Sequence, residues 1–192
     1  PELYANEEQG LDAPAVVKES VHHFAKLVSG APVVRPAWFF DTAQQGEGLV
    51  DITTHLVDLV QWACFPDIAL DWRRDVGVRR ARRWPTVVSA DEFERVTRLS
   101  AVPPFLRKDV GDDGRLHVHA NGEIDYTVRG VHAKVRVLWN FEAPAGGGDT
   151  HYSIMRGTRA DLVIRQGAAQ GWQPVLYVEP AAGTDPDALA AA

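Results

Sequence analysis

The spacing of apolar residues changes along the chain, and the first part has the period of helices. Between Pro14, which favours a first helical turn, and Gly30, which favours a helix end, apolar residues recur every three to four positions. These residues are Val17, Val21, Phe24 and Val28. The pattern predicts a helix over residues 14–29, followed by an extended segment "VVRPAWFF" in which Pro36 favours an edge or irregular strand.

Two further helices are expected in the first half. One runs from about Val50 to Phe65 and is ended by Pro66. The other follows Ser89, which forms a capping-box pattern with Glu92. Between them lies a dense basic cluster that alternates with apolar residues and predicts a strand with one solvated, arginine-rich face. Its members are Arg73, Arg74, Arg79, Arg80, Arg82 and Arg83.

From Leu116 onward the pattern has a period of two, which is typical of strands. Asn121-Gly122 predicts a hairpin turn, and four more strand candidates follow: "VHAKVRVLWNF", "THYSIMRG", "RADLVIRQG" and "PVLYVEP". Helices followed by hairpin-linked strands indicate an α+β fold with an open, mostly antiparallel sheet and helices packed on one face. We expect one domain over residues 14–180, a linker or the end of a preceding segment over 1–13, and a flexible tail over 181–192.

Composition narrows the classes of function. The chain has 192 residues and a net charge of -6, which argues against nucleic-acid binding. No apolar run approaches the ~20 residues of a membrane span, and the N-terminus lacks signal-peptide features. The single cysteine, Cys64, excludes an internal disulfide and is expected to be a buried, inert thiol. We expect a cytoplasmic protein.

The segment "GEGLVDITTHLVDL" places Asp51, His55 and Asp58 on one face of the expected helix, beside an apolar stripe that includes Leu56 and Leu59. Asp51 lies in the first turn, where the helix dipole favours a carboxylate, and one turn before His55. A carboxylate-supported imidazole suits general acid–base catalysis. The same pattern is compatible with a well-capped surface helix.

A metal site is a third interpretation of these residues. His22 or His23 would have to join His55 and Asp51, and only one of two adjacent histidines on a helix could reach. The pair His117 and His119 shares a strand face that solvent could equally occupy. Phosphate binding at Gly46-Glu47-Gly48 is disfavoured, because Glu47 and Asp51 place negative charge where a pyrophosphate would approach.

The segment "GEGLVDITTHLVDLVQW" resembles the Asp-x-x-x-His-x-x-Asp segment of the glucose–fructose oxidoreductase, inositol dehydrogenase and rhizopine-catabolism family. With "RPAWFF", "DTHYSIMRGTRADLVIRQG" and "LYVEP", it is similar to the oxidoreductase C-terminal domain group within that family. The resemblance implies an α+β domain that follows an N-terminal Rossmann domain and carries part of the substrate site. The family's Glu-Lys-Pro segment and dinucleotide loop are absent from this sequence.

By this resemblance, His55 corresponds to the catalytic histidine and Asp51 to its neighbouring carboxylate. The implied reaction is NAD- or NADP-dependent oxidation of a sugar, polyol or derivative, with the cofactor bound by the Rossmann domain of a longer parent and none by this chain alone. Further substrate-binding candidates are Asp58, Gln45, Asp41, Trp38, His151 and Arg156.

The resemblance also implies a homodimer or tetramer, because an open sheet needs its second face covered. Two other functions stay open from the sequence. One is a non-catalytic binding or oligomerisation module, and the other is a metal-dependent sugar isomerase or lyase.

Overall fold

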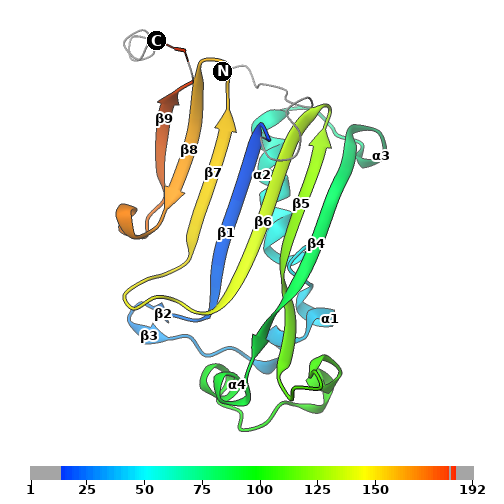
Figure 1. Cartoon of the computed structure of the whole chain (residues 1–192), viewed down its shortest axis with the longest axis vertical. Helices are drawn as coiled ribbons and strands as arrows, with labels where there is room; N and C mark the ends of the chain where they lie inside the picture. The colour runs from blue at the N-terminus through cyan, green and yellow to red at the C-terminus, as the bar shows by residue number, and fades with distance from the viewer. Residues whose placement is uncertain (1–13, 182, 185–192) are drawn as a thin grey trace.

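A seven-stranded sheet forms the body of the protein (Figure 1). The computed structural model describes residues 14–181, 183 and 184. The strands of the sheet, in spatial order, are β4 (Val76–Val88), β5 (Leu116–Val128), β6 (Val131–Glu142), β1 (Val16–Ala25), β7 (Thr150–Arg156), β8 (Ala160–Gln166) and β9 (Val175–Pro180). All neighbouring pairs in this sheet are antiparallel except β1 with β6. The expected open, mostly antiparallel sheet is confirmed.

Helices and short elements connect the strands, and α2 lies against one face of the sheet, behind β6 in Figure 1. The helices are α1 (Thr42–Gln45), α2 (Asp51–Cys64), α3 (Trp72–Asp75) and α4 (Ala90–Thr97), with 3-10 turns η2 (Ala37–Phe40), η3 (Pro104–Asp109) and η4 (Ala168–Gln170). A small ribbon joins β2 (Leu27–Val28) and β3 (Ala31–Pro32). The expected linker, 1–13, and most of the expected tail lie outside the described residues.

The prediction of a helix over residues 14–29 is wrong, because this segment forms β1 at the centre of the sheet. Its alternate residues Val16, Lys18 and Ser20 are buried on the face that α2 covers. Both polar side chains find partners on β7, since Lys18 Nζ donates to Ser153 Oγ at 3.0 Å and Ser20 Oγ lies 2.8 Å from His151 Nδ1. These partners lie far along the chain. The sequence of β1 by itself therefore shows polar residues and a helical spacing of apolar ones, although it forms a central strand.

Two other local predictions are wrong. Residues 37–40 form a 3-10 turn instead of an extended strand, with Pro36 as its N-cap. Gly122 lies inside β5, where Leu49 packs so close that an added Cβ would lie 2.4 Å from Leu49 Cδ2. The β5–β6 turn is instead Arg129-Gly130, both with positive φ, which is the conformation of a two-residue type I′ hairpin. The absence of a side chain at Gly122 thus allows the loop that carries Leu49 to pack closely against β5.

The predicted helices in the first half are confirmed as α2 and α4, and the capping box of Ser89 and Glu92 is formed at the start of α4. The arginine-rich strand is confirmed as the edge strand β4, although Arg73 and Arg74 lie in α3. The edge arginines are paired across the strands, with Arg82 Nε 3.1 Å from Glu123 Oε1. Charged edge strands resist pairing with other chains.

The core lies between α2 and the sheet, and α2 is rotated from the predicted orientation. Thr53, Leu56 and Val60 are its buried residues, whereas Leu59 of the expected apolar stripe is 43% exposed. At the N-terminal end of α2, an aromatic cluster fills the space against the sheet: Phe24, Phe39, Phe40, Phe93 and Trp139. None of the helices in the described part of the chain has the length and hydrophobicity of a membrane span.

Candidate functional site

The loop from Gly46 to Val50 leads into α2 and is fixed to the sheet. Gly48 N donates a hydrogen bond to His119 O of β5 at 2.9 Å. On the other side, Thr53 Oγ1 of α2 donates a hydrogen bond to Gly48 O. A Cβ added at Gly48 would lie 2.1 Å from Ala120 O, so only glycine fits this approach. The first turn of α2 therefore has a fixed position relative to β5.

Asp51 lies in this first turn and is half-buried. It accepts a hydrogen bond from Gln45 Nε2 at 3.2 Å, which brings two predicted site residues together. The expected hydrogen bond between Asp51 and His55 is absent from the described residues, because Asp51 is turned toward Gln45. The carboxylate is thus oriented by an amide on the preceding helix, and the dipole of α2 favours its charge.

Arg35 is a residue that the sequence did not indicate, and it lies close enough to Asp51 for their charges to interact. Its guanidinium stacks on Phe39, 4.4 Å from the ring centre, and donates to Phe24 O at 2.7 Å. Burial lowers the pKa of Arg35, and the charges of Asp149 and Asp51 oppose this shift. Arg35 is therefore a half-buried cation that supports the negative charge of Asp51 from the sheet side.

A small hollow opens beside Asp51, between the loop and the sheet. Its lining includes Gln45, Gly48, Phe39 and Trp139. Its volume is about 10 Å³, which is room for roughly one water molecule. A sugar or polyol does not fit inside this hollow, so a substrate bound near Asp51 would need a second surface to enclose it.

His55 lies on the outer face of α2, one turn after Asp51, and is exposed. Its ring forms no hydrogen bond with a residue in the part of the chain that the structure describes. Asp58 and Trp62 continue this face, and Trp62 is 75% exposed. Asp58 and Trp62 line an open hollow of about 560 Å³ next to Phe65 and Ile68. The predicted stripe is thus free to contact another molecule or domain.

Three other candidates have structural contacts. Asp41 is buried and caps α1; hydrogen bonds from Gln44 and Lys108 hold its pKa below the usual value. Trp38 is 48% exposed on η2 and packs near Phe39. Arg156 donates to the carbonyl of Pro14 and so holds the start of β1. The structure therefore places Asp41 and Arg156 in supporting contacts, away from the exposed stripe of α2.

His151 lies on β7 and faces the same side of the sheet as Ser20. Burial lowers its pKa, as do the charges of Lys18 and His22, so its ring is neutral at pH 7. Lys18 is itself buried and has a pKa lowered by burial. His151 and Lys18 form part of a polar row on the sheet, and no described hydrogen bond joins this row to Asp51 or His55.

Asp149 connects this polar row to the end of β1. Its carboxylate accepts hydrogen bonds from His22 Nδ1 and His23 Nδ1, both at 3.2 Å, and from Lys26 Nζ. Burial alone would raise the pKa of Asp149, but these hydrogen bonds and the charge of Lys26 outweigh it and hold the pKa well below its usual value. The sequence showed no signal for this cluster, because Asp149 follows a glycine-rich loop and its partners lie on a strand predicted as a helix.

Replacing Asp149 by asparagine is expected to destabilise the domain at pH 7 by about 2 kcal/mol, because charge-assisted hydrogen bonds are lost. The native pKa of Asp149 lies below the unfolded value of about 4, so its contribution is present above that pH and is lost as the pH falls. The difference in free energy of unfolding between wild type and Asp149→Asn, measured in urea from pH 7 to pH 2.5, should shrink toward low pH. A constant difference would contradict this assignment.

Neither metal binding nor nucleophilic chemistry by the Cys64 thiol is favoured by the contacts of the described residues. The described residues contain no group of three or more His, Cys, Asp and Glu side chains that could hold a metal ion. His22 and His23 bind Asp149, and His117 lies 3.1 Å from Asp113. Burial raises the pKa of the Cys64 thiol to about 11, although the charge of Lys18 opposes the shift. Cys64 is therefore protonated at neutral pH.

Comparison with known proteins gives the family. The family model described as "Putative oxidoreductase C terminal domain" matches residues 1–192. The chain belongs to this family. The oxidoreductase C-terminal domain is also similar to a solved structure of a putative oxidoreductase from Parabacteroides merdae ATCC 43184, with 52% identity and a TM-score of 0.91. No curated protein matches the chain.

The match with this solved structure covers 99% of the oxidoreductase C-terminal domain and 42% of the other chain. The domain thus spans less than half the length of the solved relative.

Proposed function

We propose that this domain forms the substrate-side wall of the active site of an NAD- or NADP-dependent oxidoreductase that acts on a sugar, a polyol or a derivative. The observation that carries the proposal is the arrangement at the start of α2. Asp51 is oriented by Gln45 and faces a hollow, and His55 is uncovered one turn later. The family assignment supports redox chemistry, and the resemblance to polyol and sugar dehydrogenases supports the substrate class.

In this proposal His55 takes the proton of the substrate hydroxyl, and the carbon that bears this hydroxyl would give up its hydride to a bound nicotinamide. An exposed imidazole suits this role, because it can reach a substrate hydroxyl and can both accept and donate a proton. Asp51 accepts a hydrogen bond from a substrate hydroxyl with the oxygen that Gln45 leaves free. The positive charge of Arg35, on the side of Asp51 away from the substrate, stabilises the ionised carboxylate of Asp51. Both side chains then act on one substrate from one wall.

We assign the nicotinamide nucleotide to an N-terminal partner domain of the full-length protein, because the Gly46-Glu47-Gly48 loop of this domain does not fit a pyrophosphate. Gly48 N, a donor that such a loop would direct at phosphate, is already bonded to His119 O. Glu47 places a carboxylate in the loop, where it pairs with Arg83. When bound, the nucleotide supplies the hydride acceptor, and this domain supplies the proton acceptor and the substrate contacts.

The experiment is a turnover assay of the full-length protein with NAD and with NADP against a panel of polyols and sugars. We expect oxidation of at least one substrate by the full-length protein and none by the 192-residue chain, because hydride chemistry belongs to the cofactor. Turnover by the 192-residue chain with added cofactor would contradict the assignment of the nucleotide to the partner domain.

We also propose that the sheet face opposite α2 joins two copies of the domain. Along one row of this face lie directly paired residues of neighbouring strands: Arg82, Glu123, Arg136, Glu19, Tyr152 and Arg165. Tyr152 is 37% exposed, and the Arg136–Glu19 ion pair is half-exposed at 3.0 Å. A two-fold interface uses the same patch on both copies, so a row with both signs of charge can place Arg136 of one copy against Glu19 of the other. Sedimentation equilibrium is expected to give a dimer or tetramer, and Tyr152→Lys is expected to weaken it. A monomer at all concentrations would contradict this proposal.

A further inference from the structure

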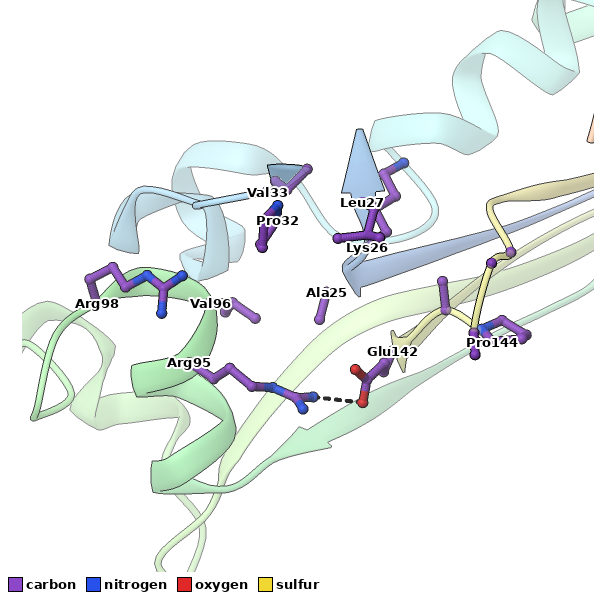
Figure 2. A pocket seen from close by; sticks show the side chains of 14 residues that line it. Ala25, Lys26, Leu27, Pro32, Val33, Arg95, Val96, Arg98, Glu142 and Pro144 are labelled. Carbon is purple, nitrogen blue, oxygen red and sulfur yellow. Dashed lines mark hydrogen bonds and ion pairs between the residues drawn. The ribbon is translucent and has the colours of Figure 1, made fainter. Parts of the chain in front are cut away.

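A cavity of about 360 Å³ lies where β1 and β6 end, away from the hollow beside Asp51. No residue is shared between the linings of the two sites. Figure 2 shows its walls, formed by the end of β1 with the β2–β3 ribbon, by the last turn of α4, and by the end of β6 with the loop that follows. A cavity of this size lies in the range of small-molecule sites.

The charges around the cavity do not cancel. Lys26 is paired with Asp149, and Arg95 Nη2 is paired with Glu142 Oε2 at 2.8 Å. Arg98 also lines the cavity, and its side chain forms no ion pair with a residue in the described ranges. The cavity therefore carries one uncompensated positive charge, on a guanidinium whose planar donors suit a carboxylate or a phosphate.

Arg98 occupies an unusual backbone position. It is the C-cap of α4 with φ 66, in the left-handed region that favours glycine. A residue with a Cβ is disfavoured there by roughly 1 kcal/mol. An arginine at this position is a costly choice for a helix end, and its side chain lines the cavity together with Val33 and Val96. Figure 2 shows the guanidinium of Arg98 on the side of the cavity opposite Glu142.

The remaining lining is apolar. Ala25, Pro32, Val33, Val96 and Pro144 contribute to the walls, and Leu27 is 58% exposed at the rim. A ligand held only by charge would leave this surface in water. An apolar body next to the charged group would bury it, at a gain of about 25 cal/mol per Å².

We propose that this cavity binds a small organic anion, with one carboxylate or phosphate monoester on Arg98 and an apolar body against Val33, Val96 and Leu27. The site does not involve Asp51 or His55. The proposal of an anion site can therefore be tested independently of the oxidoreductase proposal. It gives the domain a second small-molecule site near the Asp149 cluster, which Lys26 joins to the cavity wall.

The test is isothermal titration of the 192-residue chain with hexanoate, hexyl phosphate, inorganic phosphate and 1-hexanol. Hexanoate or hexyl phosphate is expected to bind at least about tenfold more tightly than hexanol, which lacks the charge, and than inorganic phosphate, which lacks the apolar body. The tighter of the two anions identifies the head group. Equal binding of hexanol, or inorganic phosphate as tight as hexyl phosphate, would overturn the proposal.

Arg98→Gln is the decisive variant, with Arg159→Gln as its control. Arg159 is an exposed arginine in the turn between β7 and β8 and lines none of this cavity. Arg98→Gln is expected to weaken the anion at least about tenfold and to leave the affinity for hexanol unchanged, whereas Arg159→Gln should bind as wild type does. Unfolding in urea confirms that both variants are folded. Retained affinity in folded Arg98→Gln would refute the site.

Discussion

Replacing His55 by alanine in the full-length protein is expected to lower kcat about 10²–10⁴-fold, the usual contribution of a general acid–base group. The side chain is exposed and contacts no described residue through hydrogen bonds, so its loss should leave the stability of the domain almost unchanged. The loss should be smaller at high pH, where hydroxide can remove the substrate proton. The measurement is steady-state kinetics between pH 6 and pH 10, with the unfolding midpoint as a check of folding.

His117→Ala is the matched control, because His117 is a half-exposed histidine at the start of β5 that bonds to Asp113 and not to α2. It should retain wild-type kcat. If His55→Ala also turns over at the wild-type rate, the imidazole is a spectator. The domain would then be a binding or oligomerisation module, which is one of the two other functions that the sequence leaves open.

Gly48→Ala is expected to destabilise the domain by about 3 kcal/mol, at the upper end of the range for overpacking. The added Cβ would meet backbone atoms, with Ala120 O at 2.1 Å and Asn121 C at 2.7 Å, and backbone cannot move aside as a side chain can. The hydrogen bond from Gly48 N to His119 O would be strained as the loop moves. Differential scanning calorimetry should show a decrease in Tm of roughly 6–12 °C.

Gly167→Ala provides the comparison, because a Cβ at Gly167 meets only Gln170 Oε1 at 3.7 Å and its φ of -173 is open to any residue. Its Tm should stay within about 2 °C of wild type. In the full-length protein, Gly48→Ala should also raise KM, because Asp51 follows this loop. A Tm for Gly48→Ala equal to that of Gly167→Ala would show that the loop is not held against β5.

The elements that the sequence predicts correctly are those whose signals are local. The capping box of Ser89 and Glu92 defines the start of α4, and alternation in "VHAKVRVLWNF" predicts β6, in which the alternate residues Val135, Val137 and Trp139 are buried. The helix that carries Asp51 and His55 is also predicted by local residues, together with the position of both on it. The fold class follows from these elements alone.

The errors occur where a distant segment decides the structure. Lys18, Ser20 and His22 make β1 look unlike a central strand until Ser153, His151 and Asp149 are placed beside them. Gly122 looks like a turn until Leu49 packs against it. Arg35 looks like a surface arginine until Phe39 and Trp139 enclose its guanidinium. In each case the deciding contact comes from tertiary structure, which spacing along the chain does not encode.

The place of β1 has a consequence for how this domain acquires its shape. The first strand in the described part of the chain lies between two later ones, with Val16 opposite Ala133 on one side and Met155 on the other. Assembly on the ribosome must therefore wait until both later strands have emerged, and such non-local pairing slows folding.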